Sequence, residues 1–328
     1  MHVEIGPASL VITAEKGGRT FEFELAKVEA AVKSILAEIG AYLPLLKQKA
    51  YRIKNVKGLP PTVRSMVEAT RVVDEEGLTP LAAVAGAVSD ALREFLKTDA
   101  PDLIMVNNGG DISIFNSTDK TLGIGIGNIA TGSPTPYVLR IGGINGFGIA
   151  TSGFGGRSFT LGLADLATVV AATGAVADAA ATFLGNRTNV PTDAVARQRA
   201  GDIDPLTDIP DELVTIRIGE MERGLVMQAL RNGLAEAERL KARGIIHDAL
   251  IVIKGEMAAT MGAGNNSISK SKMISRRQGG GDEAYCTYVE EADDDANKDS
   301  ALIEEWNNIS YGRRIHRPNI TLEVERGN

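Results

Sequence analysis

The residues best suited to chemistry in this chain are an aspartate and a threonine four positions apart. They are Asp178 and Thr182, at the two ends of the segment Asp-Ala-Ala-Ala-Thr. On a helix this spacing places the carboxylate and the hydroxyl on one face. Two hard oxygen ligands one turn apart suit Mg²⁺, whose coordination would be completed by backbone carbonyls, water and the phosphates of a ligand. The alternative is that both side chains are simply solvated.

A second segment, Val-Asn-Asn-Gly-Gly-Asp-Ile, places two glycines between strand-like stretches. Because Asn-Gly is the strongest short hairpin signal, one interpretation is a plain turn. The other is a binding site, in which Gly109 and Gly110 let a ring or a phosphate reach backbone amides. The polar side chains of Asn107, Asn108 and Asp111 would then bind ligand groups at the rim.

A third segment carries adjacent hydroxyls and glycines at the end of a strand. Thr151, Ser152 and Gly153 run into Phe-Gly-Gly-Arg-Ser, whose one cation is Arg157. Hydroxyls, exposed amides and an arginine together make a phosphate cradle. A glycine-rich surface loop with one arginine is the structural alternative.

Other common nucleotide and catalytic motifs are absent from the sequence. It has no GxxxxGK[ST] P-loop, and the Gly-Ile-Gly-Ile-Gly stretch at 123–127 is not followed by the helix start that a dinucleotide fingerprint requires. The three histidines, His2, His247 and His316, stand beside no other candidate catalytic residue. A Rossmann dehydrogenase and a histidine-centred hydrolase are therefore disfavoured.

The composition is that of a globular protein, with 44% hydrophobic and 23% charged residues among 328. The net charge of −7 argues against a nucleic-acid partner. A single cysteine, Cys286, excludes an internal disulfide, and it excludes an iron–sulfur cluster or thiolate zinc site held by this chain alone. We find no signal peptide and no membrane-spanning stretch, so a cytoplasmic location is expected.

These segments must be positioned by a fold with both helices and sequential strands. Helices are predicted over 26–50, 60–73, 81–96, 175–184 and 225–243, with Pro44 kinking or ending the first. Strands are predicted over 3–15, 19–25, 102–107, 111–115, 122–127, 137–141, 164–172, 213–219 and 249–254. Consecutive strands without an intervening helix favour an α+β fold with an antiparallel or mixed sheet. The small residues of 81–96 would let another backbone lie close.

The character of the chain changes after about residue 260. The sequence predicts one domain over 1–260 and a C-terminal extension over 261–328. The extension is polar, yet it has a strand-like stretch at 319–324 and four of the larger aromatic residues, Tyr285, Tyr288, Trp306 and Tyr311. We therefore expect it to be partly ordered and packed against the body or against a second subunit of a homo-oligomer.

Taken in order, four segments resemble the ApbE-like superfamily of flavin transferases. Its pattern is an Ala/Gly-rich helix ending in Asp, a Gly-Gly-Asp strand turn, Ala-Thr-Ser-Gly, and a helix with Ala-Asp-Ala-x-x-Thr. The same order occurs here at 82–90, 108–111, 150–153 and 177–182, within a resemblance that covers about residues 1–260. It implies an ApbE-like fold of mixed or antiparallel sheets with packed helices.

The resemblance also implies a site and its ligands. Asp178 and Thr182 match the magnesium-binding pair of the transferases. The implied cofactor is FAD or FMN, with Mg²⁺. The residues that would line the flavin-nucleotide pocket are Ala85, Gly86, Asp90, Asn107, Asn108, Gly109, Gly110, Asp111, Thr151, Ser152 and Gly153.

Two departures from the pattern bear on the activity. The transferases carry a lysine in the Ala/Gly helix, where this chain has Ala85. They also carry a His-Ile-Ile-Asp-Pro segment, where this chain has Ser-Phe-Thr-Leu-Gly-Leu-Ala-Asp at 158–165. This variant is similar to a cytoplasmic branch of the superfamily without an assigned function, and to the flavin module of 6-hydroxynicotinate reductase-type enzymes.

The leading hypothesis is therefore a flavin-nucleotide-binding protein that forms part of a flavin-dependent reductase for a small substrate, such as a heteroaromatic compound. Electrons would come from a redox partner protein or from a nicotinamide, since the chain alone cannot ligate an iron–sulfur cluster. One alternative is a Mg²⁺-dependent FAD:protein FMN transferase. The other is a non-catalytic subunit or scaffold with a vestigial pocket.

Overall fold

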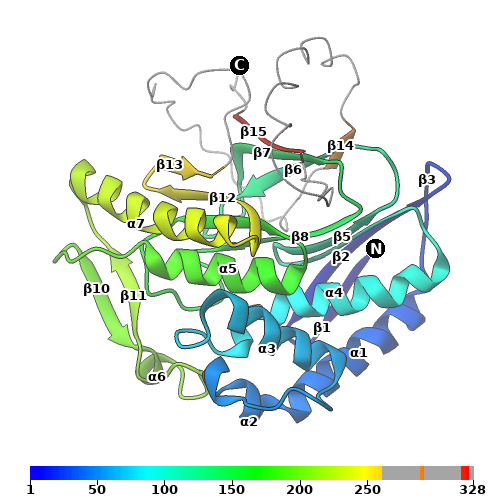
Figure 1. Ribbon diagram of the computed structural model, residues 1–328, viewed down its shortest axis with the longest axis horizontal. Helices are drawn as coiled ribbons and strands as arrows, with labels where there is room; N and C mark the ends of the chain where they lie inside the picture. The colour runs from blue at the N-terminus through cyan, green and yellow to red at the C-terminus, as the bar shows by residue number, and fades with distance from the viewer. Residues whose placement is uncertain (261–288, 292–318, 325–328) are drawn as a thin grey trace, which may run out of the picture.

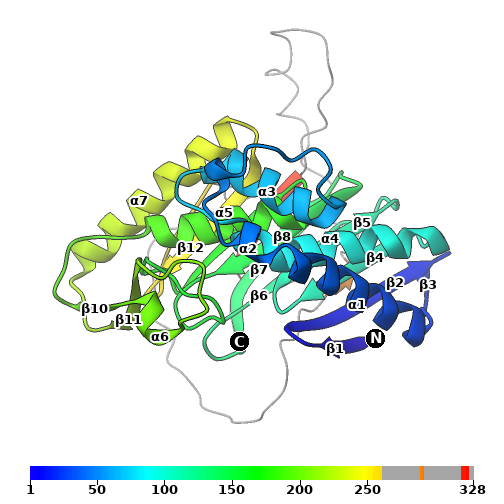
Figure 2. The same cartoon turned by 90° about the horizontal axis from the view of Figure 1, so that it is seen from below.

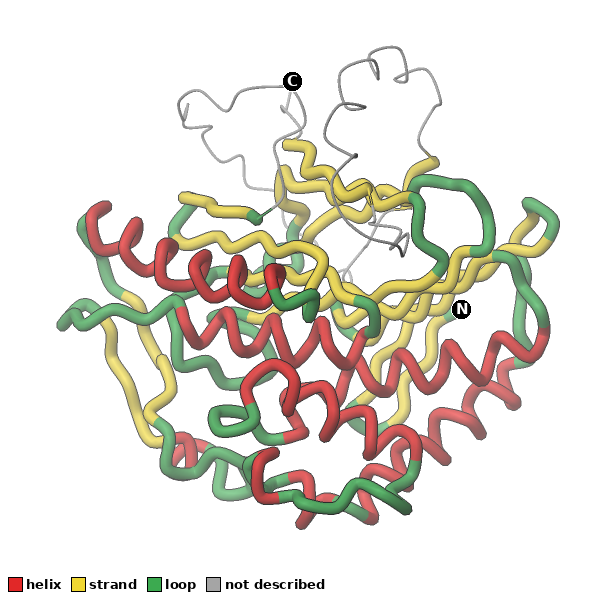
Figure 3. Tube along the Cα trace, in the orientation of Figure 1, coloured by secondary structure: helices red, strands yellow, loops and turns green. Residues whose placement is uncertain are grey.

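The computed structural model describes residues 1–260, 289–291 and 319–324. The described residues form three layers (Figure 1). A nine-stranded sheet lies in the middle, helices cover one of its faces, and a four-stranded sheet lies against the other. Figure 3 separates the helical layer from the strands by colour. The fold is α+β, as predicted.

The helices follow the amphipathic segments of the sequence. They are α1 (Leu25–Ala41), α2 (Leu43–Leu46), α3 (Pro61–Asp74), α4 (Val84–Leu96), α5 (Gly174–Arg187), α6 (Ala200–Ile203) and α7 (Arg223–Ala242). The first predicted helix is divided near Pro44 as expected, because proline cannot donate a helical hydrogen bond. The helix predicted from residue 81 begins instead as a 3-10 turn, Pro80–Ala83, which leads into α4.

The large sheet is antiparallel throughout. Its strands are β1 (His2–Ile5), β2 (Ala8–Lys16), β3 (Arg19–Thr20), β4 (Leu103–Asn108), β5 (Asp111–Asn116), β8 (Gly146–Ser152), β9 (Leu166–Ala171), β12 (Ile246–Ile253) and β13 (Glu256–Ala259). Their order is β1-β2-β4-β5-β8-β9-β12-β13, with β3 beside β2. The predicted strand 3–15 is divided by a turn at Gly6, whose φ is 55°.

The smaller sheet has the order β14-β6-β7-β15. Its strands are β6 (Leu122–Gly127), β7 (Pro134–Gly142), β14 (Val289–Glu291) and β15 (Asn319–Val324). The strand predicted at 319–324 is confirmed by β15. A separate ribbon pairs β10 (Val195–Arg199) with β11 (Leu213–Ile218). Two segments of the extension, β14 and β15, therefore pair with strands of the body. The aromatic residues of the extension, Tyr285, Tyr288, Trp306 and Tyr311, lie outside the described residues, so the packing expected for them stays a prediction.

Two apolar cores hold the layers together. One lies between the helices and the large sheet, and the other lies between the two sheets. Figure 2 shows the helical layer from below, with α4 and α5 close to the sheet. Strands β4 and β9 are buried along their whole length because both faces of the sheet are covered there. None of the helices in the described ranges is long and apolar enough to cross a membrane.

Helices α4 and α5 cross with their backbones in contact. A Cβ atom on Gly86 would lie 2.1 Å from the carbonyl oxygen of Gly174. A Cβ atom on Gly148 of β8 would lie 2.2 Å from the amide nitrogen of Gly174. No side chain fits at either position unless the backbone moves. The close backbone approach expected for the small residues of 81–96 is therefore confirmed, and it fixes α4, α5 and β8 relative to one another.

We expect Gly86→Ala to lower the free energy of unfolding by about 3 kcal/mol, because the added methyl group must push α4 away from α5. The matched control is Gly40→Ala in α1, where a Cβ atom would meet nothing within 4 Å. That substitution should be neutral or stabilising by up to about 1 kcal/mol, since alanine is the better helix former. Urea unfolding of both variants measures the difference, and equal effects would contradict the crossing.

Candidate functional site

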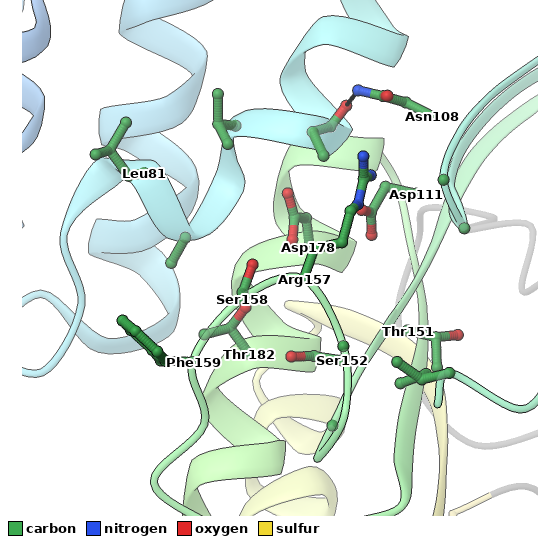
Figure 4. A pocket seen from close by; sticks show the side chains of 18 of the residues that line it. Leu81, Asn108, Asp111, Thr151, Ser152, Arg157, Ser158, Phe159, Asp178 and Thr182 are labelled. Carbon is green, nitrogen blue, oxygen red and sulfur yellow. Dashed lines mark hydrogen bonds between the residues drawn. The ribbon is translucent and has the colours of Figure 1, made fainter. Parts of the chain in front are cut away.

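A cavity of about 900 Å³ opens beside α4 and α5 (Figure 4). Its wall is built from the β4–β5 turn, the end of β8, the loop after β8, strand β6 and the loop between α6 and β11. The four segments that the sequence analysis singled out therefore meet at one place. All the site residues expected from the sequence line the cavity except Gly86, Asp90 and Asn107.

Asp178 and Thr182 lie on the side of α5 that faces the cavity, as their spacing predicts. The Asp178 carboxylate accepts a hydrogen bond from the amide of Gly86 at 3.0 Å, and another from the amide of Ala85. These amides belong to the first turn of α4, whose own N-cap residue, Ala83, has no side-chain acceptor. Asp178 therefore caps α4 while it faces the cavity.

Asp90 caps α5 in return. Its carboxylate lies behind the cavity wall and accepts hydrogen bonds from the amides of Gly174 and Ala175, each at 2.9 Å. Ser113 of β5 donates a further short hydrogen bond to it. The sequence predicts Asp90 in the pocket, but the carboxylate oxygen atoms of Asp90 face the first turn of α5. Gly86, also predicted in the pocket, lies instead where α4 and α5 touch.

The Gly-Gly-Asp segment is both a hairpin and part of the cavity wall. Strands β4 and β5 pair as far as Asn108 opposite Asp111. Gly109 and Gly110 form the two-residue turn between them, with φ values of 66° and 107° that favour glycine. Asn107 accepts a hydrogen bond from the Gly110 amide at 2.7 Å, so it shapes the turn from behind the wall. The hairpin interpretation is therefore confirmed, and ligand binding at this turn, which lines the cavity, stays a prediction.

Two side chains tie this turn to α4. The Asn108 amide group donates to the carbonyl oxygen of Ala85 at 3.4 Å, and the Ser89 hydroxyl donates to the carbonyl oxygen of Asp111 at 2.8 Å. Helix α4 thus positions the turn that carries Asp111. Through the crossing it also positions the helix that carries Asp178.

Thr151 and Ser152 end β8 at the cavity, and Gly153 begins the loop that follows. Thr151 shares a hydrogen bond with Thr168 of β9 at 2.9 Å. A Cβ atom on Gly153 would lie 2.7 Å from the carbonyl oxygen of Asp165, so glycine is needed for this close packing. Beyond it, the exposed Arg157 completes the lining of the cavity on this side.

The wall carries two carboxyl groups that influence each other. Burial raises the pKa of Asp178 from 3.8 to about 7, against the opposing effects of its hydrogen bonds from α4 and the charge of Arg157. The charge of Asp90 raises this pKa as well. Burial raises the pKa of Asp111 well above 3.8, and the charge of Asp178 raises it further. This part of the cavity therefore favours a bound cation.

Four further polar side chains of the cavity lining are not predicted from the sequence. They are Lys49, Thr79, Asp208 and Glu212. Lys49 donates to the carbonyl oxygen of Gly77 at 2.8 Å and to Glu212 at 3.3 Å, and Thr79 donates a short hydrogen bond to Asp208. No local pattern marks these residues, since Thr79 and Asp208 are 129 positions apart. The two prolines and three aspartates of 204–212 indicate only a loop.

One family model and several curated proteins match this chain. A family model described as AbpE bacteria matches residues 1–259. A UPF0280 protein of Methanopyrus kandleri is 31% identical over 222 residues, which cover 64% of this chain and 87% of that protein. A UPF0280 protein of Methanothrix thermoacetophila is 37% identical over 131 residues, which cover 40% of this chain and 54% of that protein. The chain spans about half the length of several of the relatives it matches.

Solved structures with a related arrangement include a mutant of the flavin transferase ApbE from Vibrio cholerae. It has a TM-score of 0.42 and 12% sequence identity, over 79% of this chain and 97% of that one. The apo flavinyl transferase ApbE from Pseudomonas stutzeri has a TM-score of 0.30 and 16% identity, over 76% of this chain and 74% of that one.

We expect Asp178→Asn to remove roughly 1–2 kcal/mol of the stability that the wild type loses between pH 4 and pH 8, because the variant has no poorly solvated carboxylate to ionise. The pKa of Asp178 is about 7 in the folded protein and 3.8 ordinarily. Between about pH 4 and pH 7 the folded state therefore holds a proton that the unfolded state has lost, and the stability of the wild type falls as the pH rises. The stability of the variant should fall less than that of the wild type over this pH range.

Urea unfolding of both proteins from pH 4 to pH 8 measures this difference. The exposed Asp193 lies outside the cavity lining and provides the control, Asp193→Asn, which should keep the wild-type pH profile. A wild type and an Asp178→Asn variant with parallel pH profiles would show that Asp178 is an ordinary surface carboxylate.

Proposed function

The chain belongs to the family described as AbpE bacteria, and from that premise we propose that its cavity binds a flavin nucleotide together with Mg²⁺. The observation that carries this proposal is the meeting of Asp111, Asp178 and Thr182 at one wall of a large cavity. The superfamily that the sequence resembles includes flavin transferases, which act on nucleotides of this class.

The donor set of this wall suits magnesium. Asp111, Asp178 and Thr182 offer hard oxygen atoms, the ligand type that Mg²⁺ prefers. Burial raises the pKa of both carboxyl groups, so a divalent cation would relieve an existing electrostatic cost. Within the described part of the chain, no group of three or more His, Cys, Asp or Glu side chains could hold a metal ion. Water, carbonyl oxygens and the phosphates of the nucleotide would supply the remaining ligands.

The rest of the lining suits a nucleotide with a large planar ring. A volume of about 900 Å³ is near the upper end for small-molecule sites. Ile129 supplies apolar surface, whereas the side chains of Ile124 and Ile126 are buried in the core between the two sheets. Gly125 and Gly127 alternate with these two isoleucines along β6, and a Cβ atom on either glycine would meet nothing within 4 Å. One part of the cavity wall is therefore open at two glycines and can accept a ring. Another part carries carboxyl groups, which can hold the cation that accompanies the phosphates.

We propose further that the chain is a component of a flavin-dependent reductase for a small substrate such as a heteroaromatic compound. A bound flavin supplies the hydride or electron transfer itself, and the protein orients the flavin and sets its surroundings. Ala85 supports this role, because it lines the cavity where the transferases of the superfamily carry a lysine. No histidine occurs in the lining formed by the described residues. The electrons would come from a partner protein or from a nicotinamide.

A flavinyl transferase is the second candidate. It is favoured by the family match and by the position of Asp178 and Thr182, which face the cavity together from one side of α5. In that role these two residues would hold Mg²⁺ beside the pyrophosphate of FAD, where the cation offsets negative charge.

The expected ligand behaviour is FAD binding that depends on Mg²⁺. Calorimetric titration should detect it for the wild type in MgCl₂ and show it at least about tenfold weaker in EDTA. Asp178→Asn should weaken it by roughly tenfold or more, because a charged ligand of the cation is lost. Thr182→Val should cause a smaller loss, and the control Asp193→Asn should cause none. FAD binding that is equal in EDTA and in MgCl₂, or unaltered by Asp178→Asn, would refute the site.

The two catalytic candidates differ in what becomes of bound FAD. A reductase component should retain intact flavin that denaturation releases, with no AMP formed. A transferase should release AMP and leave FMN covalently attached to a protein hydroxyl. Chromatography of the nucleotides and intact mass measurement, after incubation with FAD and MgCl₂, distinguish these outcomes. AMP release that is lost in Asp178→Asn would replace the reductase by the transferase, whereas a protein that binds no flavin would support the non-catalytic alternative.

A further inference from the structure

Arg157 is the cation of the glycine-rich loop after β8 (Figure 4). Its side chain is exposed at the cavity and reaches toward Asp111 and Asp178. A Cβ atom on Gly109 would lie 2.2 Å from Nη2 of Arg157, so the guanidinium fills the space that a side chain on the β4–β5 turn would occupy. Glycine at position 109 therefore admits the arginine to the carboxylate wall.

The arginine is held there by weak contacts. Its hydrogen bond to the carbonyl oxygen of Pro7 is 3.5 Å long, at the limit for such a bond. Figure 4 shows its side chain beside Asp111 and Asp178, and at this position its positive charge lowers the pKa of both carboxyl groups. It nevertheless fails to bring either pKa back to its ordinary value. Arg157 thus compensates the two carboxyl groups only in part.

The chemistry of this wall changes when a magnesium ion and a phosphate arrive. A magnesium ion beside Asp178 would repel the guanidinium, because two cations would share the same carboxylates. A phosphate attached to that ion offers the guanidinium a bidentate partner, which arginine binds better than lysine does. The arginine should therefore weaken the binding of magnesium alone and strengthen the binding of magnesium together with a phosphate.

We propose that Arg157 is the phosphate-binding residue of the cavity and that, without ligand, it takes the place of the cation beside Asp111 and Asp178. This inference rests on the proposed function and narrows its ligand to a nucleotide whose phosphates are bound together with Mg²⁺. The arginine disfavours Mg²⁺ alone and favours Mg²⁺ with a nucleoside diphosphate. Cation and nucleotide are consequently bound together.

The test is a pair of calorimetric titrations of the full chain, with MgCl₂ alone and with ADP in saturating MgCl₂. Arg157→Ala should bind Mg²⁺ alone about three- to tenfold more tightly, because a competing cation is gone. It should bind Mg²⁺–ADP and Mg²⁺–FAD about 10–100-fold more weakly, because a charged hydrogen-bond donor is lost. Riboflavin has no phosphate, so any affinity for it should be unchanged. Arg157→Lys should bind Mg²⁺–ADP with intermediate affinity.

The control variant is Arg223→Ala, which removes an exposed arginine bonded to Glu256 outside the cavity lining and should alter neither titration. The proposal is overturned if Arg157→Ala shifts the affinities for Mg²⁺ alone and for Mg²⁺–ADP in the same direction, or shifts neither. If the wild type binds Mg²⁺–ADP but no flavin, the proposed function is refuted, and the role of Arg157 in phosphate binding still stands. A wild type that binds neither ADP nor FAD refutes both.

Discussion

The backbone contact between α4 and α5 at Gly86 and Gly174 is the constraint on which the rest of this structure depends. Because the two helices touch there, the first turn of each comes within reach of a carboxylate on the other. Asp90 caps α5 and does not line the cavity, whereas Asp178 caps α4 and also faces the cavity. The hydrogen bonds that stabilise the crossing also orient the principal side chain of the site. The fold and the site therefore cannot be altered independently at this point.

The crossing also concentrates negative charge where a cation is useful. Without a cation, burial and mutual repulsion oppose the ionisation of Asp111 and Asp178, and this reduces stability at neutral pH. The same two carboxyl groups offer oxygen ligands to Mg²⁺, so stability and binding make opposite demands on them. Arg157 offsets part of the repulsion, and in our proposal its guanidinium binds a phosphate once a magnesium ion has taken its place beside the carboxyl groups. The loop after β8 thus carries one side chain, Arg157, that both offsets the charge of the two carboxyl groups and, in our proposal, binds the phosphates of the nucleotide.

Local sequence patterns were sufficient for the parts of the site that local geometry controls. The four-residue spacing of Asp178 and Thr182 predicted a shared helix face, and Gly109 with Gly110 predicted a hairpin. Sequence could not tell whether the Asp90 carboxylate would meet a ligand or a helix end, because its partner Gly174 is 84 positions away. The strands β6 and β7 were expected, but periodicity does not say which sheet a strand joins. Long-range packing decided each of these cases.

In the proposed complex, the wall formed by Asp111, Asp178 and Thr182 holds a cation on the phosphates of a flavin nucleotide. The decisive experiment is a crystal structure of the protein with FAD and Mn²⁺, a stand-in for Mg²⁺ with a usable anomalous signal. We expect an anomalous peak at Asp178 and Thr182, phosphate density beside it and within reach of Arg157, and the flavin ring inside the cavity. A peak on other carboxylates, or FAD bound outside the cavity, would contradict it.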